Sequence, residues 1–195
     1  MKPSKIVSPK SHVCPWWLIR TFDNFVRRFF QKPEGILQDI VRPGDACLDI
    51  GCGIGYFTIP MAGIVGPSGS VTAVDLQPEM LAGVRRRAEK AGLLSRIRLQ
   101  QGDASGLHFE AAFDLALAFW MVHEVPDQGS LIQQIRSALK PGGRFLLVEP
   151  KVHVRQAAFD RTVGLAEKAG LTRVKPLDIF FSRAVLMVNR SESAA

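Results

Sequence analysis

Three glycines at two-residue spacing follow a single carboxylate in the sequence LDIGCGIGYFT, which places Asp49 ahead of Gly51, Gly53 and Gly55. Glycine lets the backbone approach a ligand closely and leaves the amides of a following helix open to it. A dinucleotide-binding loop needs glycine where Tyr56 stands, and a carboxylate at the strand end would repel a pyrophosphate. Asp49 instead suits a ligand that carries an ammonium or sulfonium group.

Two further acidic residues end or follow predicted strands. Asp75 lies in Val74-Asp75-Leu76, and Asp103 precedes Ala104. Taken alone, Asp75 could cap a helix and Asp103 could be a turn residue. In an open α/β sheet, however, ligands bind at the carboxyl ends of the strands, where both carboxylates would lie.

Alternating strand-like and helix-like stretches predict the sheet that positions these residues. We expect parallel strands at 46–50, 70–75, 96–101, 113–119 and 144–149. Helices should follow Pro78 and Asp127, ending near Gly92 and Pro141-Gly142-Gly143, with another at 155–169. The runs 171–177 and 182–188 are joined by too short a link for a helix, so they should form an antiparallel hairpin. The predicted fold is α/β, Rossmann-like and doubly wound, with seven mostly parallel strands and a C-terminal hairpin.

The N-terminal stretch carries an apolar helical stripe made of Leu18, Phe22, Phe25, Val26 and Phe29. We expect two parts: a helical extension over residues 1–32 that covers the sheet, and the sheet domain over 33–195. Two alternatives are a movable cover over a ligand pocket and a basic amphipathic helix on a membrane surface.

Five landmarks occur in register over about residues 33–189: the Asp49 glycine motif, Val74-Asp75-Leu76, Gly102-Asp103-Ala104, Phe113-Asp114, and the run LKPGGR at 139–144. In this order they resemble the class I S-adenosylmethionine-dependent methyltransferases. The resemblance implies S-adenosylmethionine as cofactor and methyl transfer as the activity.

The resemblance also assigns roles to residues. It implies that Asp75 holds the ribose hydroxyls and that Asp103 and the Ala104 amide hold the adenine. The expected cofactor-binding set is Asp49, Gly51, Cys52, Gly53, Gly55, Asp75, Leu76, Asp103, Ala104 and Phe119.

The run WMVHEVPD at 120–127 resembles the segment after the fourth strand in small-molecule methyltransferases, such as quinone-ring and arsenite methylating enzymes, in which a histidine often precedes Val-Pro-Asp. The match is partial, because Glu124 stands directly before the valine. His123 and Glu124 are the candidate catalytic residues, against a packing role for His123 and a helix-start role for Glu124. Glu149, near the end of the fifth predicted strand, is a further candidate for a base, but a structural role is expected for it.

Three tryptophans are candidate acceptor contacts: Trp16, Trp17 and Trp120. Trp16 and Trp17 are adjacent and cannot face one core from the same helical turn, so one of them could line the acceptor pocket. The alternative is that both are buried between helix and sheet.

Charge and residue composition limit the kinds of substrate and ligand that we expect for this chain. The chain has 195 residues and a net charge of +7, of which residues 1–46 carry +4, 47–150 carry −1 and 151–195 carry +4. Neither flank has a dense basic run, which disfavours a nucleic-acid partner. The family resemblance points the same way, because methyltransferases that act on nucleic-acid bases usually carry an Asn/Asp-Pro-Pro-Tyr/Phe element after the fourth strand, where this chain has AFWM at 118–121. Three cysteines are too few for a zinc site, so no metal is expected, and they suit a reducing compartment, so the expected location is cytoplasmic. The expected substrate is a small-molecule acceptor; the alternatives are a protein side chain and a non-catalytic regulatory module that binds the cofactor.

Overall fold

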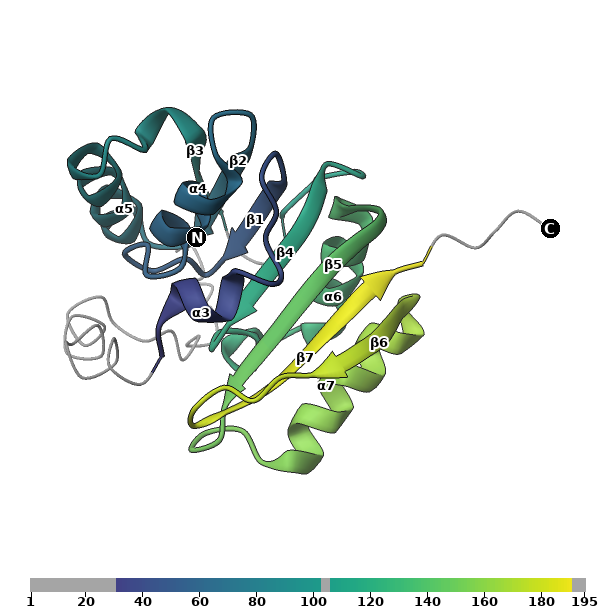
Figure 1. The fold of residues 1–195 in the computed structure, drawn as a ribbon. Helices are drawn as coiled ribbons and strands as arrows, with labels where there is room; N and C mark the ends of the chain where they lie inside the picture. Colours follow the sequence, from purple (N-terminus) through teal and green to yellow (C-terminus); the bar gives the residue numbers. More distant parts are fainter. Residues whose placement is uncertain (1–30, 103–105, 191–195) are drawn as a thin grey trace, which may run out of the picture.

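The computed structural model of the chain describes residues 31–102 and 106–190 (Figure 1). In this part of the chain seven strands form one sheet in the order β3-β2-β1-β4-β5-β7-β6. The strands are β1 (Ala46–Ile50), β2 (Ser70–Asp75), β3 (Ile97–Gln101), β4 (Phe113–Phe119), β5 (Leu139–Pro150), β6 (Leu171–Pro176) and β7 (Ser182–Asn189). Strands β1 to β5 are parallel and β7 is antiparallel to both of its neighbours, which confirms the predicted fold class.

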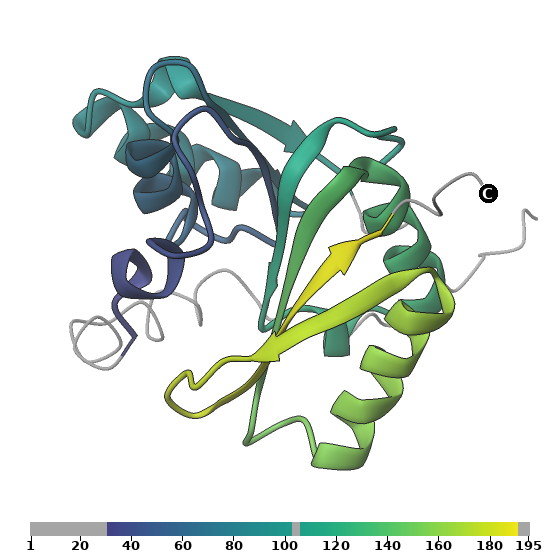
Figure 2. The same cartoon turned by 45° about the vertical axis from the view of Figure 1, so that its right-hand side comes forward.

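Helices cover both faces of the sheet (Figure 2). The described helices are α3 (Pro33–Leu37), α4 (Thr58–Val65), α5 (Pro78–Lys90), α6 (Gln128–Ala138) and α7 (Gln156–Lys168), with short 3₁₀ turns η1 (Leu94–Arg96) and η2 (Val122–Glu124). Apolar residues of α3, α4 and α5 form one core with one face of the sheet, and those of α6 and α7 form a second core with the other face. Because both faces are buried, the central strand β4 reads as a continuous apolar run from Leu115 to Phe119.

Local signals set the helix ends near the site. Asp127 caps α6, accepting a hydrogen bond from the Ser130 amide at 2.9 Å, and Pro78 occupies the start of α5. Gly92, with φ 67°, follows the end of α5 as predicted.

The fifth strand differs from the prediction, because β5 begins at Leu139 rather than at residue 144. Leu139 pairs with Phe113, and the register shifts before Arg144 pairs with Leu115. The helix therefore ends at Ala138, and Pro141-Gly142-Gly143 forms an irregularity within the strand instead of stopping the helix. The Asn189 side chain stabilises this region by donating to the Leu139 carbonyl at 2.9 Å.

The hairpin brings the start of the last strand to the ligand-binding edge. Ser182 at the beginning of β7 pairs with Pro150 at the carboxyl end of β5. The loops before β7 and after β5 therefore lie at the same edge as the glycine-rich turn after β1. Residues 1–30, 103–105 and 191–195 lie outside the described residues, and with them the predicted N-terminal helix, Trp16, Trp17, Asp103 and Ala104.

The described residues contain neither a membrane-spanning helix nor a cluster of metal-binding side chains. None of their helices combines the length and the hydropathy that crossing a bilayer requires. Nor do three His, Cys, Asp or Glu side chains come together in residues 31–102 and 106–190 as potential metal ligands.

Candidate cofactor and acceptor site

The glycine-rich turn after β1 needs glycine for two different reasons. Gly51, Gly53 and Gly55 have φ values of 67°, 53° and 88°, in the left-handed region. A Cβ on Gly51 would lie 3.0 Å from the Met121 side chain, so close packing also requires glycine there. A Cβ on Gly53 would meet nothing within 4 Å. The backbone at Gly53 therefore faces open space, as close approach to a ligand requires.

Asp75, at the end of β2, is bonded to this turn. Its Oδ2 accepts from the Gly53 amide at 2.9 Å, and its Oδ1 accepts from the Gln77 amide at 3.0 Å. Burial raises the pKa of Asp75, although the hydrogen bonds from the Gln77, Gly53 and Leu76 amides oppose that rise. Each carboxylate oxygen has two lone pairs, so both retain capacity for a ligand hydroxyl. This chemistry fits a ribose diol.

Asp49 is almost completely buried at the end of β1. It is 3% exposed, and its Oδ2 accepts a hydrogen bond from Thr58 Oγ1 at 2.6 Å. Burial raises the pKa of Asp49 to about 7; the bond from Thr58 lowers it and the nearby charge of Asp75 raises it. A cationic group would favour the ionised form of Asp49, so the residue fits the positively charged part of S-adenosylmethionine.

Three apolar members of the predicted cofactor set lie around this turn. Cys52 is buried, and burial raises the pKa of its thiol well above the ordinary range, so it is an unreactive loop residue. Leu76 is exposed just after Asp75. Phe119 is buried, with its ring centroid 4.2 Å from that of Phe57. Direct cofactor contact by these three stays a prediction.

His123 is held by a buried carboxylate that the sequence analysis treated as structural. Glu149 Oε2 lies 2.6 Å from His123 Nδ1, and Glu149 Oε1 accepts from the His123 amide at 3.0 Å. Glu149 is 1% exposed. Burial lowers the pKa of His123, but the bond to Glu149 and the charges of Glu149 and Glu124 outweigh burial and raise it. An ionised Glu149 can only accept, so Nδ1 carries the proton and the neutral ring keeps Nε2 as its acceptor.

Glu124 lies beside His123 in η2, at the carboxyl end of β4. Its amide donates to the Met121 carbonyl at 3.0 Å, and its charge contributes to the raised pKa of His123. A direct part in chemistry for Glu124 stays a prediction. Sequence reasoning named Glu149 from its position but did not pair it with His123. The signal for the pairing is that Glu149 lies next to the end of β5, the strand beside β4, and that carboxyl ends of adjacent parallel strands meet.

Trp120 is fixed between β4 and the hairpin. It has a positive φ of 60°, its amide donates to the Val148 carbonyl at 2.8 Å, and its Nε1 donates to Ser182 Oγ at 3.0 Å. Gln31 joins the same region, because its Nε2 donates to the Phe180 carbonyl at 2.8 Å and Tyr56 Oη donates to the Gln31 carbonyl at 2.7 Å. The first described residue is thus anchored at the ligand-binding edge.

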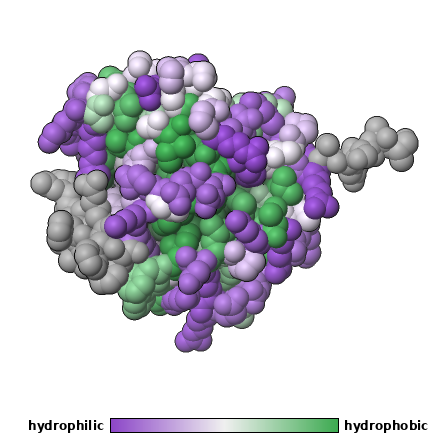
Figure 3. Space-filling model, in the orientation of Figure 1, coloured by the Kyte–Doolittle hydropathy of each residue, from purple (hydrophilic) through white to green (hydrophobic). Residues whose placement is uncertain are grey.

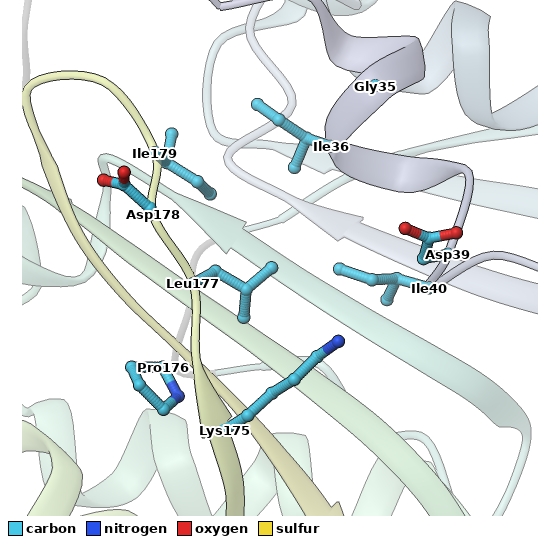
Figure 4. Close-up of a pocket in the computed structure, with 9 residues that line it drawn as sticks. All are labelled: Gly35, Ile36, Asp39, Ile40, Lys175, Pro176, Leu177, Asp178 and Ile179. Atoms are coloured by element: carbon cyan, nitrogen blue, oxygen red, sulfur yellow. The ribbon is translucent and has the colours of Figure 1, made fainter.

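A separate groove of about 280 Å³ opens between α3 and the β6–β7 hairpin (Figure 4). Its apolar lining comes from Ile36 and Ile40 on one side and Leu177 and Ile179 on the other, with Lys175 reaching across. None of the residues that line it belongs to the predicted cofactor or acceptor set. The groove is therefore distinct from the glycine-rich turn and the His123–Glu149 pair.

Comparison with known proteins identifies the family. The profile of the family described as "Methyltransferase domain" matches residues 47–143, which include the glycine-rich turn, Asp75 and His123. The chain carries a methyltransferase domain of this family and is similar to the class I S-adenosylmethionine-dependent methyltransferases. S-adenosylmethionine is the cofactor of this family, and the chemistry of Asp49, Asp75 and the open Gly53 backbone fits it.

Two curated relatives of this methyltransferase domain are both named demethylmenaquinone methyltransferase. The one from Lactobacillus johnsonii is 33% identical over 130 residues, which is 66% of this chain and 51% of the relative. The one from Symbiobacterium thermophilum is 38% identical over 117 residues, 60% of this chain and 47% of the relative. The chain thus spans about half the length of these relatives.

Solved structures share the fold at low sequence identity. A SAM-dependent methyltransferase from Aquifex aeolicus has a TM-score of 0.81 and 19% identity, with 91% of this chain and 100% of that chain covered. The [4+2]-cyclase SpnF has a TM-score of 0.66 and 22% identity, with 76% of this chain and 60% of that chain covered. Since one of these neighbours is named a cyclase, the fold alone does not specify the reaction.

Proposed function

We propose that this methyltransferase transfers a methyl group to a small acceptor of the hydroquinone class. The observation that carries the proposal is the His123–Glu149 pair, which lies at the same sheet edge as the cofactor turn. The names of the curated relatives support a quinone-type acceptor. They do not favour a non-catalytic binding module.

Bound S-adenosylmethionine supplies a methyl group that its sulfonium charge already activates for displacement. The chain must hold the cofactor, align the acceptor and remove a proton. We assign the first task to Asp49, the glycine-rich turn and Asp75, together with Asp103 and Ala104 at the adenine end.

We assign removal of the proton from the acceptor to His123. Its Nε2 accepts the proton that the acceptor loses as the new bond to the methyl carbon forms, and Glu149 stabilises the resulting imidazolium through Nδ1. Trp120 is fixed by Ser182 beside this edge, and its indole supplies apolar surface for an aromatic acceptor.

The N-terminal extension, residues 1–32, is proposed to cover the acceptor side of the site. The anchoring of Gln31 by Tyr56 and the Phe180 carbonyl supports this, since the chain reaches the sheet domain at the ligand-binding edge. Trp16 or Trp17 would then contact the acceptor. The free thiols of Cys47 and Cys52 support a reducing, cytoplasmic compartment.

The proposal is tested with two measurements on the wild-type chain and on His123→Ala. Calorimetry with S-adenosylhomocysteine should show binding by both proteins. Transfer of a labelled methyl group to reduced naphthoquinone, followed by mass spectrometry, should fall by about 10²-fold or more in His123→Ala. His108→Asn is the matched control, because His108 is exposed and has a φ of 42°, which asparagine tolerates.

Three results would contradict parts of the proposal. Absence of heat with S-adenosylhomocysteine would remove the cofactor assignment. Heat without methylated product would favour the binding module, and wild-type turnover in His123→Ala would end the role of that residue as base.

A further inference from the structure

Two loops at the carboxyl end of β5 present apolar side chains to solvent. Val152, in the loop after β5, is 72% exposed, and Phe181, in the loop before β7, is 55% exposed. The loops are joined by a hydrogen bond from the Lys151 amide to the Phe181 carbonyl at 2.9 Å. Phe180 packs its ring edge-on against Phe181, with centroids 4.7 Å apart. We call Val152, Phe180 and Phe181 the apolar tip.

The backbone at Phe181 is strained in this arrangement. Phe181 has a φ of 55°, in the left-handed region that bulky side chains rarely adopt. A large apolar side chain in a strained backbone and more than half exposed contributes little to the stability of the domain itself. Such an outlier points to a role outside the fold.

Basic residues outnumber acidic ones in the two segments that carry the apolar tip. Residues 150–155 carry Lys151 and Arg155, and residues 177–183 carry Arg183 and Asp178, so the two segments together hold three basic and one acidic side chain. Figure 3 shows hydrophobic surface at the lower left of the molecule, where Figure 1 places both loops, with hydrophilic surface next to it. Exposed apolar side chains with the exposed basic residues Lys151 and Arg155 next to them in the chain match the interface of an anionic lipid bilayer.

The apolar tip adjoins the proposed acceptor site. His153 follows Val152 on the same loop, and its ring is stacked on that of His123 with centroids 6.1 Å apart. Ser182, directly after Phe181, holds the Trp120 indole. A surface bound at the tip would therefore lie next to the residues that face the acceptor.

We propose that the apolar tip docks the protein on anionic membrane surfaces, with Phe181 and Val152 inserted at the boundary between headgroups and acyl chains and with Lys151 and Arg155 facing lipid phosphates. The binding surface serves to collect an acceptor that is dissolved in the bilayer. Docking itself goes beyond the proposed function, since it does not require methyl transfer.

Flotation with vesicles tests the docking surface without cofactor or acceptor. The wild-type chain should float with vesicles made of equal parts phosphatidylcholine and phosphatidylglycerol, and much less with phosphatidylcholine alone. The double variant Val152→Ser, Phe181→Asn should lose about tenfold in apparent affinity, because it removes apolar area that enters the interface. Asparagine is chosen because it tolerates the positive φ at position 181. Lys151→Glu with Arg155→Glu should give a similar loss.

Val174→Ser is the matched control, because Val174 is 53% exposed on β6, outside the two loops. It should float like the wild type, and all variants should unfold at similar temperatures. The proposal is overturned if the wild type does not float or if the double variant floats as well as Val174→Ser. Phe25→Asp tests the alternative that the predicted N-terminal helix binds the membrane, and the proposal is also overturned if this is the only variant that reduces flotation. It is also overturned if ultracentrifugation shows a dimer that the double variant dissociates while vesicle binding is unchanged.

Discussion

His123 and Glu149 are 26 residues apart in the chain and form two hydrogen bonds, one through the His123 backbone amide at 3.0 Å and one through Nδ1 at 2.6 Å. The hydrogen bond from the backbone amide fixes the position of the histidine, and the hydrogen bond at Nδ1 fixes the tautomer of its ring. A residue held in this way is prepared to take a proton at Nε2 without reorganisation.

Glu149→Gln should lower the pKa of His123, because burial would remain while the negative charge of Glu149 and one of its two acceptor oxygens would be lost. Proton NMR titration of the His123 ring measures this directly, and the pH profile of methyl transfer should shift to lower pH with a reduced maximum. A histidine whose pKa is raised in the folded state adds stability below its unfolded value of 6.5, which is lost as pH rises through the folded pKa. In Glu149→Gln this pH-dependent stability should shrink.

The control for that variant is Glu167→Gln, which removes a half-exposed ion pair with Arg173. It should leave the titration of His123 unchanged. An unaltered His123 pKa in Glu149→Gln would show that Glu149 does not set the protonation of the ring.

Asp49→Asn should stabilise the cofactor-free protein at pH 8. The pKa of Asp49 is raised from 3.8 to about 7, so the folded state binds more protons than the unfolded state between these values. The corresponding stability is present below about pH 3.8 and is lost as pH rises to about 7. Removing the buried charge should recover a few kcal/mol at pH 8, roughly the free energy of a shift of this size. Thermal unfolding at pH 4 and pH 8 should show a gain only at pH 8.

The same substitution should weaken cofactor binding. In the wild type, affinity for S-adenosylmethionine should decrease as pH falls below about 7, because protonated Asp49 no longer attracts its cationic group. Calorimetry across this range should show the decrease in the wild type and a flat profile in Asp49→Asn. A pH-dependent profile that persists in the variant would assign the titration to another group.

Asp75→Ala should weaken cofactor binding by about 1 to 3 kcal/mol, because it removes charge-assisted hydrogen bonds. It also leaves the Gly53 and Gln77 amides without their carboxylate acceptor, so unfolding must be measured in parallel. Asp75→Asn keeps one acceptor oxygen and should lose less affinity. Unchanged affinity in both variants would place Asp75 outside the cofactor site.

Comparison of Gly51→Ala with Gly53→Ala distinguishes the effect of tight packing at position 51 from the effect of ligand approach at position 53. Both impose left-handed strain of about 1 to 2 kcal/mol. Only Gly51→Ala also brings a Cβ to 3.0 Å from Met121, so it should be the more destabilising of the two in chemical denaturation. Gly53→Ala places its Cβ in open space and should lose cofactor affinity out of proportion to its loss of stability. Equal affinity in Gly53→Ala and the wild type would argue against close approach of the cofactor at that position.

Sequence reasoning predicted the strands that are buried on both faces, because a short apolar run between turn residues has few alternatives. The bounds of β1, β2 and β4 agree with the predicted ranges. It failed at the start of β5, where Leu139 pairs with Phe113 across an irregular register that no local pattern encodes. The fold class was accessible because the parallel order follows from the alternation of strands and helices.

The sequence alone predicted only part of the candidate site. Asp49 and Asp75 were found from their positions after strands. Glu149 was not linked to His123, because their contact depends on β4 and β5 being neighbours in the sheet. The left-handed backbone of Trp120 and its bond to Ser182 likewise depend on the hairpin returning to the carboxyl edge.

Strand β7 lies between β5 and β6, so the last strand of the described residues completes the interior of the sheet. During synthesis, β5 has an open edge until residues 182–189 have left the ribosome. Seven paired positions join β5 to β7, and the Trp120 indole has its Ser182 acceptor only when they form. The acceptor edge is therefore complete only after residues 182–189 have been made, and a nascent chain stalled before residue 182 would display an exposed, aggregation-prone strand.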